Sequence, residues 1–191
     1  MRVRIHQEPP TYDEPYDSTR WEEHIRRVHW TIDQFIQWHG STQRVGAIDD
    51  LIDLACGDAS IPLGIGQAVG ATVDLGDLLP HTAVPLSFTG PIEETVKLAT
   101  RRQRYDLLVC TEVLEHLRDP DQVLRDARNL ATNILVTTPV DEAHDSENVE
   151  HLWSWGTEDV RKMLWDADFR VTEYHNTLHG GYYTYQLWIA S

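Results

Sequence analysis

Basic residues are scarce in this sequence. Its 16 lysines and arginines stand against 31 aspartates and glutamates, which gives a formal net charge of −15. Proteins that bind DNA or RNA obtain much of their affinity by neutralising phosphates with basic side chains. The composition therefore argues against a broad nucleic-acid groove, although a small local basic patch is compatible with it.

Cysteines and long apolar runs are also scarce. The only cysteines, Cys56 and Cys110, lie in apolar segments, so neither a disulfide framework nor a zinc site with paired cysteine ligands is predicted. No segment reaches the roughly 20 apolar residues that span a bilayer. The start, MRVRIHQEPP, lacks the apolar stretch of a signal peptide. We therefore expect a cytoplasmic protein that does not contact a membrane.

The length of 191 residues fits one α/β domain, and no repeat or low-complexity tract divides it. We expect residues 1–17 to form an irregular arm and residues 18–191 to form the domain. Its first helix begins at TRWE, where Thr19 can cap the helix and Glu22 can reach back, and Gly40 ends it. Helical spacing predicts the buried stripe of this helix as Trp21, Ile25, Val28, Ile32 and Phe35.

Short apolar strands alternate with helical patterns along the rest of the chain. The expected strands are 51–55, 71–75, 83–88, 105–110 and 133–139, and a closing pair in FRVTEY and YYTYQLWIA. The expected helices are IPLGIGQAV, IEETVKLAT, DPDQVLRDARNLA and TEDVRKMLWDA, the last capped by Thr157. This alternation predicts an α/β fold with a doubly wound, mainly parallel seven-stranded sheet.

Two turns with acidic residues follow the first two strands, at the sheet edge where such folds bind ligands. In DLACGDAS, Gly57 would let backbone approach a ligand, while Asp53 lies inside the strand, where a carboxylate needs donors or a cation. In TVDLGD, Asp74 can accept hydrogen bonds from both hydroxyls of a ribose. Taken singly, Asp53 can equally brace its turn, and Asp74 can be a turn or cap aspartate.

Together these turns resemble those of the class I S-adenosylmethionine-dependent methyltransferases, and the resemblance covers about residues 45–175. The family's first turn usually reads acidic-x-Gly-x-Gly-x-Gly, whereas this chain reads Asp53-x-Ala55-x-Gly57-x-Ala59. The resemblance implies a Rossmann-like enzyme with S-adenosylmethionine as cofactor, its methionine end near Asp53 and Gly57 and its ribose near Asp74. The implied cofactor-binding residues are Asp53, Ala55, Gly57, Asp74, Ile92 and Thr111.

The adenine end departs from the family pattern. Pro91 stands where an acidic residue commonly meets the adenine amino group, so that contact is not expected, while Ile92 can pack on the adenine face. A nicotinamide dehydrogenase would share the layout of strands, but the first turn lacks the Gly-x-Gly-x-x-Gly order of those enzymes. A methyltransferase is therefore favoured.

The stretch CTEVLEHL follows the fourth expected strand and is expected beneath the transferred methyl group. Glu112, Glu115 and His116 are related by i, i+3 and i+4, which predicts that they share one helix face. Two carboxylates there repel each other unless a cation or a donor compensates. In one interpretation Glu112 caps the helix while the other two pack against neighbours, and many methyltransferases have a similar run without a metal.

A second polar stretch, DEAHDSENVEHLWSW, follows the fifth strand and contains His151. The two stretches resemble the metal-dependent 2′-O-methyltransferases of small-RNA 3′ ends, and the first is also similar to ubiquinone-pathway O-methyltransferases. The metal ligands implied by this resemblance are Glu112, Glu115, His116 and His151. Two oxygen and two nitrogen ligands suit Mg²⁺, Mn²⁺, Fe²⁺ or Zn²⁺.

These patterns predict O-methylation of a small-molecule hydroxyl, with nitrogen as the less favoured acceptor atom. A divalent ion would lower the pKa of the hydroxyl, and without one His116 or His151 can act as general base. Glu112, His116 and His151 are accordingly the predicted catalytic residues. One alternative is a 2′-O-methyltransferase for RNA ends, which the motif favours and the net charge opposes. The other is a non-catalytic scaffold of the same fold, which would have no need of this polar cluster.

Overall fold

The structure, a computed structural model, describes residues 1–8, 11–41, 47–80, 83–141, 150–179 and 183–191. Seven strands of this part form one sheet in the order β4-β3-β2-β5-β6-β9-β8. They are β2 (Asp50–Asp53), β3 (Thr72–Asp77), β4 (Phe88–Thr89), β5 (Tyr105–Thr111), β6 (Ala131–Val140), β8 (Val171–His179) and β9 (Tyr183–Ala190). The strands from β4 to β6 are parallel, and β9 pairs antiparallel with both β6 and β8. The predicted doubly wound, mainly parallel sheet is confirmed.

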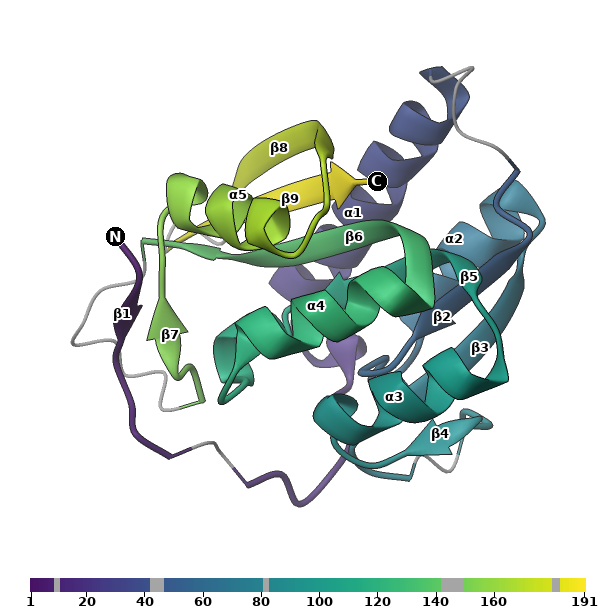
Figure 1. Cartoon of the computed structure of the whole chain (residues 1–191), viewed down its shortest axis with the longest axis horizontal. Helices are drawn as coiled ribbons and strands as arrows, with labels where there is room; N and C mark the ends of the chain where they lie inside the picture. Colours follow the sequence, from purple (N-terminus) through teal and green to yellow (C-terminus); the bar gives the residue numbers. More distant parts are fainter. Residues whose placement is uncertain (9–10, 42–46, 81–82, 142–149, 180–182) are drawn as a thin grey trace.

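Helices cover both faces of the sheet (Figure 1). They are α1 (Glu22–Ser41), α2 (Ser60–Val69), α3 (Ile92–Arg102), α4 (Pro120–Leu130) and α5 (Thr157–Asp166). The helices α3, α4 and α5 pack on one face, and α1 and α2 on the other, so each face has its own apolar core. Because strand order reverses between β2 and β5, the switch point of the sheet lies there.

The start of the chain is more regular than expected. Within the predicted irregular arm, β1 (Val3–Arg4) pairs antiparallel with β7 (Trp153–Ser154), and the backbone N–H of Ile5 donates to the carbonyl of Leu152 at 2.8 Å. The arm is therefore attached to the segment that contains His151. No helix in the described part of the chain is long and apolar enough to cross a bilayer.

The entry to the first helix also differs from the prediction. A short 3₁₀ helix, η1 (Ser18–Arg20), precedes α1, and its cap is Asp17, whose carboxylate accepts a hydrogen bond from the backbone N–H of Thr19 at 2.9 Å. Two members of the predicted stripe, Trp21 and Ile25, are 52% and 37% exposed. The buried face of α1 instead consists of Arg27, Val28, Thr31, Phe35 and Trp38.

Two further predictions change in detail. Residues 83–88 were predicted to form a strand, but only Phe88 belongs to one, because Pro85 lacks the N–H that a strand ladder requires. The cap of α5 is Gly156 and not Thr157, since the Asp159 side chain accepts a 3.0 Å hydrogen bond from the Gly156 backbone N–H. Neither change alters the order of the strands in the sheet.

Candidate active site

A cavity of about 570 Å³ opens where the carboxyl ends of β2, β3 and β5 meet, next to the switch point. Small-molecule sites have volumes of about 300–1,000 Å³. Its walls come from the turn after β2, the end of β3, the N-terminus of α3, the loop after β5 and the arm that precedes α1. A doubly wound sheet binds its ligand at this position.

The turn after β2 brings backbone to the cavity. Gly57 has a φ of +53°, which residues with a side chain rarely adopt. A Cβ atom at this position would lie 3.0 Å from Cδ1 of Tyr16. The backbone N–H of Gly57 donates a 2.7 Å hydrogen bond to Asp77. The turn thus requires glycine, both because of its positive φ and because Tyr16 packs directly against it.

Asp53 supports this turn from inside the protein. It is 1% exposed, does not line the cavity, and accepts a 2.9 Å hydrogen bond from the backbone N–H of Ala55. Burial raises its pKa to about 8. Of the two interpretations of Asp53, the geometry matches the bracing one.

Asp74 lies away from the cavity, contrary to the prediction. Its carboxylate accepts hydrogen bonds from the hydroxyls of Tyr105 at 2.6 Å and Ser87 at 2.7 Å, and Arg102 lies 3.8 Å away. Although burial acts to raise the pKa of Asp74, the Tyr105 and Ser87 hydrogen bonds lower it below its ordinary value. The carboxylate therefore has a structural role on the other side of the sheet edge.

Asp77, which the sequence reasoning missed, lines the cavity, whereas Asp74 is not among the lining residues. It is the last residue of β3, lines the cavity, and accepts hydrogen bonds from the backbone N–H groups of Gly57 and Leu79 at 2.7 and 3.3 Å. Asp77 was not considered because the strand was expected to end at residue 75, two residues before its end in the structure. Four of the predicted cofactor-binding residues do line the cavity: Ala55, Gly57, Ile92 and Thr111.

The loop after β5 does not form the predicted helix face. Glu112 has a φ of +56°, residues Leu114–His116 form the 3₁₀ helix η2, and α4 begins only at Pro120, capped by Asp119. The i, i+3 and i+4 spacing therefore does not describe the site. What gathers the side chains is the left-handed turn at Glu112 followed by η2.

Glu112 forms a buried ion pair with Arg27 of α1. Its Oε2 atom lies 3.0 Å from Nη1 of Arg27, and its Oε1 atom accepts a 2.9 Å hydrogen bond from the Thr137 hydroxyl. The arginine is 7% exposed and also donates to the hydroxyls of Tyr185 at 3.0 Å and Tyr16 at 2.7 Å. Sequence reasoning missed Arg27, and the only available signal was a basic residue beside Val28 on the apolar side of the helix.

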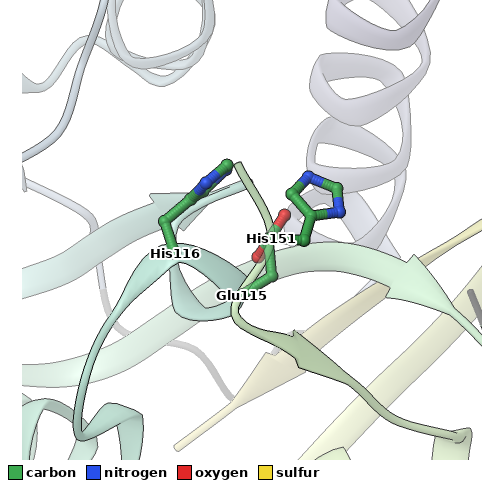
Figure 2. Close-up of side chains that lie close together, drawn as sticks. All are labelled: Glu115, His116 and His151. Atoms are coloured by element: carbon green, nitrogen blue, oxygen red, sulfur yellow. The ribbon is translucent and has the colours of Figure 1, made fainter. Parts of the chain in front are cut away.

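Glu115, His116 and His151 form a compact cluster (Figure 2), in which each contributes a donor atom within 4.8 Å of the others. The two imidazole rings lie 4.8 Å apart at 77°. Glu115 is fully buried and accepts a 3.0 Å hydrogen bond from Thr138. Burial, and then the nearby Glu112 carboxylate, raise the pKa of Glu115 to about 8. Three of the four predicted metal ligands are thus brought together.

The ring of His116 is held in one orientation. Its Nδ1 atom lies 2.9 Å from the carbonyl oxygen of Glu150 and 3.1 Å from the Tyr12 hydroxyl. Because a carbonyl only accepts hydrogen bonds, the contact with Glu150 requires the proton on Nδ1 and places the lone pair on Nε2. The backbone N–H of Leu152 donates to the carbonyl of Glu115 at 2.7 Å, which brings the His151 segment to η2.

The residues fit a divalent ion only in part. Glu115, His116 and His151 are suitable oxygen and nitrogen donors. The fourth predicted ligand, Glu112, is instead neutralised by Arg27 at 3.0 Å. The predicted four-ligand site is therefore not assembled in this structure.

Residues 21–174, most of the chain, match the family described as a methyltransferase domain. The chain belongs to the S-adenosylmethionine-dependent class I methyltransferases. The cavity fits this cofactor, since its volume of about 570 Å³ suits a small molecule, the turn at Gly57 lines it and Ile92 offers an apolar wall. No curated protein sequence matches this methyltransferase.

Several solved structures have the same fold. Magnesium protoporphyrin IX methyltransferase from Synechocystis PCC 6803 with bound S-adenosylhomocysteine is 17% identical, with a TM-score of 0.66 over 94% of this chain and 89% of that chain. A methyltransferase of Leishmania major is 13% identical, with a TM-score of 0.68 over 89% and 74%. The [4+2]-cyclase SpnF is 12% identical, with a TM-score of 0.66 over 92% and 83%. At these identities the likeness establishes the fold alone, and the acceptor has to be inferred from the site.

Proposed function

We propose that this methyltransferase methylates a hydroxyl oxygen of a small molecule, with His116 as general base. The observation that supports this role is the hydrogen bond between Nδ1 of His116 and the carbonyl of Glu150, which leaves the lone pair on Nε2, where it can accept a proton. S-adenosylmethionine supplies an electrophilic methyl group when it is bound. His116 holds the proton that the acceptor oxygen loses, so a neutral hydroxyl becomes a competent nucleophile.

The charges around His116 are balanced without an ion. Arg27 neutralises Glu112 at 3.0 Å, and burial, together with the Glu112 carboxylate, raises the pKa of Glu115 and so favours its neutral form. The two carboxylates, which would otherwise repel each other, are therefore compatible with one buried site. We propose that Glu112 and Glu115 position the base cluster, and that His151 packs against the His116 ring to hold it.

We assign the cofactor contacts from the cavity lining. The Gly57 turn and Thr111 would hold the methionine end, Asp77 would accept the ribose hydroxyls in place of Asp74, and Ile92 would pack on the adenine. Asp53 would support the turn from behind. Tyr12 and Tyr16 of the arm line the same cavity, which favours a small acceptor over an RNA end.

A metal-assisted form of the same reaction is the second candidate. The grouping of Glu115, His116 and His151 within 4.8 Å favours it, and the Arg27 contact with Glu112 opposes it. An ion held by these three residues would lower the pKa of the acceptor hydroxyl. The ion pair between Arg27 and Glu112, the fourth predicted ligand, is the reason that we rank the metal-free base first.

The test is a methyl-transfer assay with a panel of hydroxylated small molecules, with and without a chelator. We expect activity in the chelator and a fall in kcat of about 10²–10⁴-fold in His116→Gln, as for the loss of a general base. His29→Gln, on the exposed side of α1, is the matched control and should retain activity. Loss of activity in chelator, restored by one divalent ion that metal analysis finds in stoichiometric amount, would instead support the metal-assisted form.

A further inference from the structure

The cavity has one feature that the proposed reaction does not use. Among the described residues of its lining, Arg27 is the deeply buried cation, at 7% exposure. Arg118 also lines the cavity, but its side chain is 66% exposed and pairs with Glu8 at the surface. A guanidinium buried in a ligand cavity requires acceptors for its N–H groups.

Arg27 has more donors than its neighbours satisfy. Of its five N–H groups, Nη1 donates to Glu112 and Tyr185, and Nη2 donates to Tyr16. The Nε atom is buried and has no hydrogen-bond partner among the described residues. Because Nε–H and one Nη2–H are parallel, this edge of the guanidinium has the fork geometry that binds a carboxylate through two hydrogen bonds.

From this edge we infer that the acceptor is a hydroxy acid whose carboxylate binds Arg27 while its hydroxyl faces His116. The inference rests on the proposed function and adds the substrate class. Arg27 is joined to Glu112 in the loop that continues to His116, so both groups of a short molecule can be held in one cavity. The Glu112 charge is already held by Arg27 and by the Thr137 hydroxyl, which limits its repulsion of the acid.

The surroundings of Arg27 strengthen such a contact. The rings of Tyr16 and Tyr185 lie 5.8 and 5.2 Å from the guanidinium carbon, and they shield it from water. Tyr16 comes from the arm and its hydroxyl now occupies Nη2, so an acid oxygen would join or replace it there. The net charge of −15 makes such a local cation necessary for an acidic acceptor.

The experiment measures binding separately from turnover. The three hydroxyphenylacetate isomers and their methyl esters are titrated calorimetrically into the protein saturated with S-adenosylhomocysteine, and each is also assayed for methyl transfer. We expect at least one acid to bind about 10-fold or more tighter than its ester, as for a hydrogen bond to a charged group. Arg27→Met should abolish this preference, whereas Arg26→Met, on the exposed neighbour of Arg27, should retain it.

A folding defect is controlled with a second variant. Arg27→Met combined with Glu112→Gln removes both charges, leaves no unpaired buried carboxylate, and should show the same loss of preference. Equal binding of acids and esters, or failure of every acid to bind while S-adenosylhomocysteine binds, would overturn the inference. So would a variant that loses S-adenosylhomocysteine affinity but keeps the preference, because Arg27 would then serve the cofactor carboxylate.

The two proposals fail in different ways in this experiment. Methyl transfer to neutral hydroxyl compounds without any preference for acids leaves the proposed function intact and overturns the hydroxy-acid inference. Preferential binding of acids that are never methylated overturns the proposed function and leaves the Arg27 carboxylate site standing.

Discussion

The two ends of the cavity are built differently. At the end proposed for the cofactor the wall is a backbone turn, in which Gly57 has a φ of +53° and is hydrogen-bonded to Asp77 at the end of β3. At the acceptor end they come from side chains of separate segments, with Arg27 from α1 paired to Glu112 from the loop after β5. A wall formed by backbone suits a ligand that stays the same, whereas buried charged side chains can be substituted to suit another acceptor.

This difference predicts which substitutions lower the free energy of unfolding most. A buried ion pair costs much more when one partner is removed than when both are. Arg27→Met alone should therefore lower the free energy of unfolding by about 3–5 kcal/mol, and the double variant with Glu112→Gln should lose clearly less. Chemical denaturation measures both, with Arg26→Met as the control, because its exposed pair with Glu22 contributes little. Equal losses in the single and double variants would show that the pair is not coupled.

At the cofactor end the expected effects fall on binding and not on folding. Asp77→Ala should weaken S-adenosylhomocysteine binding by about 1–3 kcal/mol, because it removes the proposed ribose acceptor and the Gly57 contact. Asp74→Ala should leave that affinity unchanged and instead lower stability, since Tyr105 and Ser87 lose their acceptor. Calorimetric titration and thermal melts of both variants separate the roles. The reverse result would restore the ribose contact to Asp74.

The same difference explains what the sequence could predict. The sheet and the Gly57 turn follow from local patterns, in which apolar strands alternate with helices and a glycine follows a strand. Asp77 was not considered as a candidate because that choice depends on where β3 ends, and strand ends are weakly marked in TVDLGD.

The acceptor end depended on contacts that no local pattern reveals. The spacing of Glu112, Glu115 and His116 predicted a helix face, but a left-handed residue and a 3₁₀ turn gather the side chains in another way. Arg27 is remote from this loop in sequence, and its role follows only from the packing of α1 on the sheet. Proximity of His151 was predicted from the family resemblance and not from residue spacing.

Asp58 attaches the turn after β2 to the end of the arm, since it accepts hydrogen bonds from Ser18, the residue that follows the arm. Its carboxylate accepts hydrogen bonds from the backbone N–H and hydroxyl of Ser18 at 2.7 and 2.5 Å, and from the backbone N–H of Ser60 at 3.0 Å. Although burial acts to raise the pKa of Asp58, these hydrogen bonds lower it below its ordinary value. The ionised form is therefore the one that holds the arm to the turn.

The sign of the resulting pH dependence is fixed by that lowered pKa. An aspartate whose pKa is lower in the folded state adds stability above its unfolded pKa of about 3.9, and this stability is lost as pH falls through the folded pKa. At pH 7 the free energy of unfolding of Asp58→Asn should be about 1 kcal/mol lower than that of the native protein, a small difference because the carboxylate is partly exposed. This difference in stability should close below about pH 4. Thermal melts between pH 3 and 7 measure it, with Asp33→Asn on the exposed side of α1 as the control. A difference that persists unchanged at low pH would mean that the charge of the Asp58 carboxylate does not attach the end of the arm to this turn.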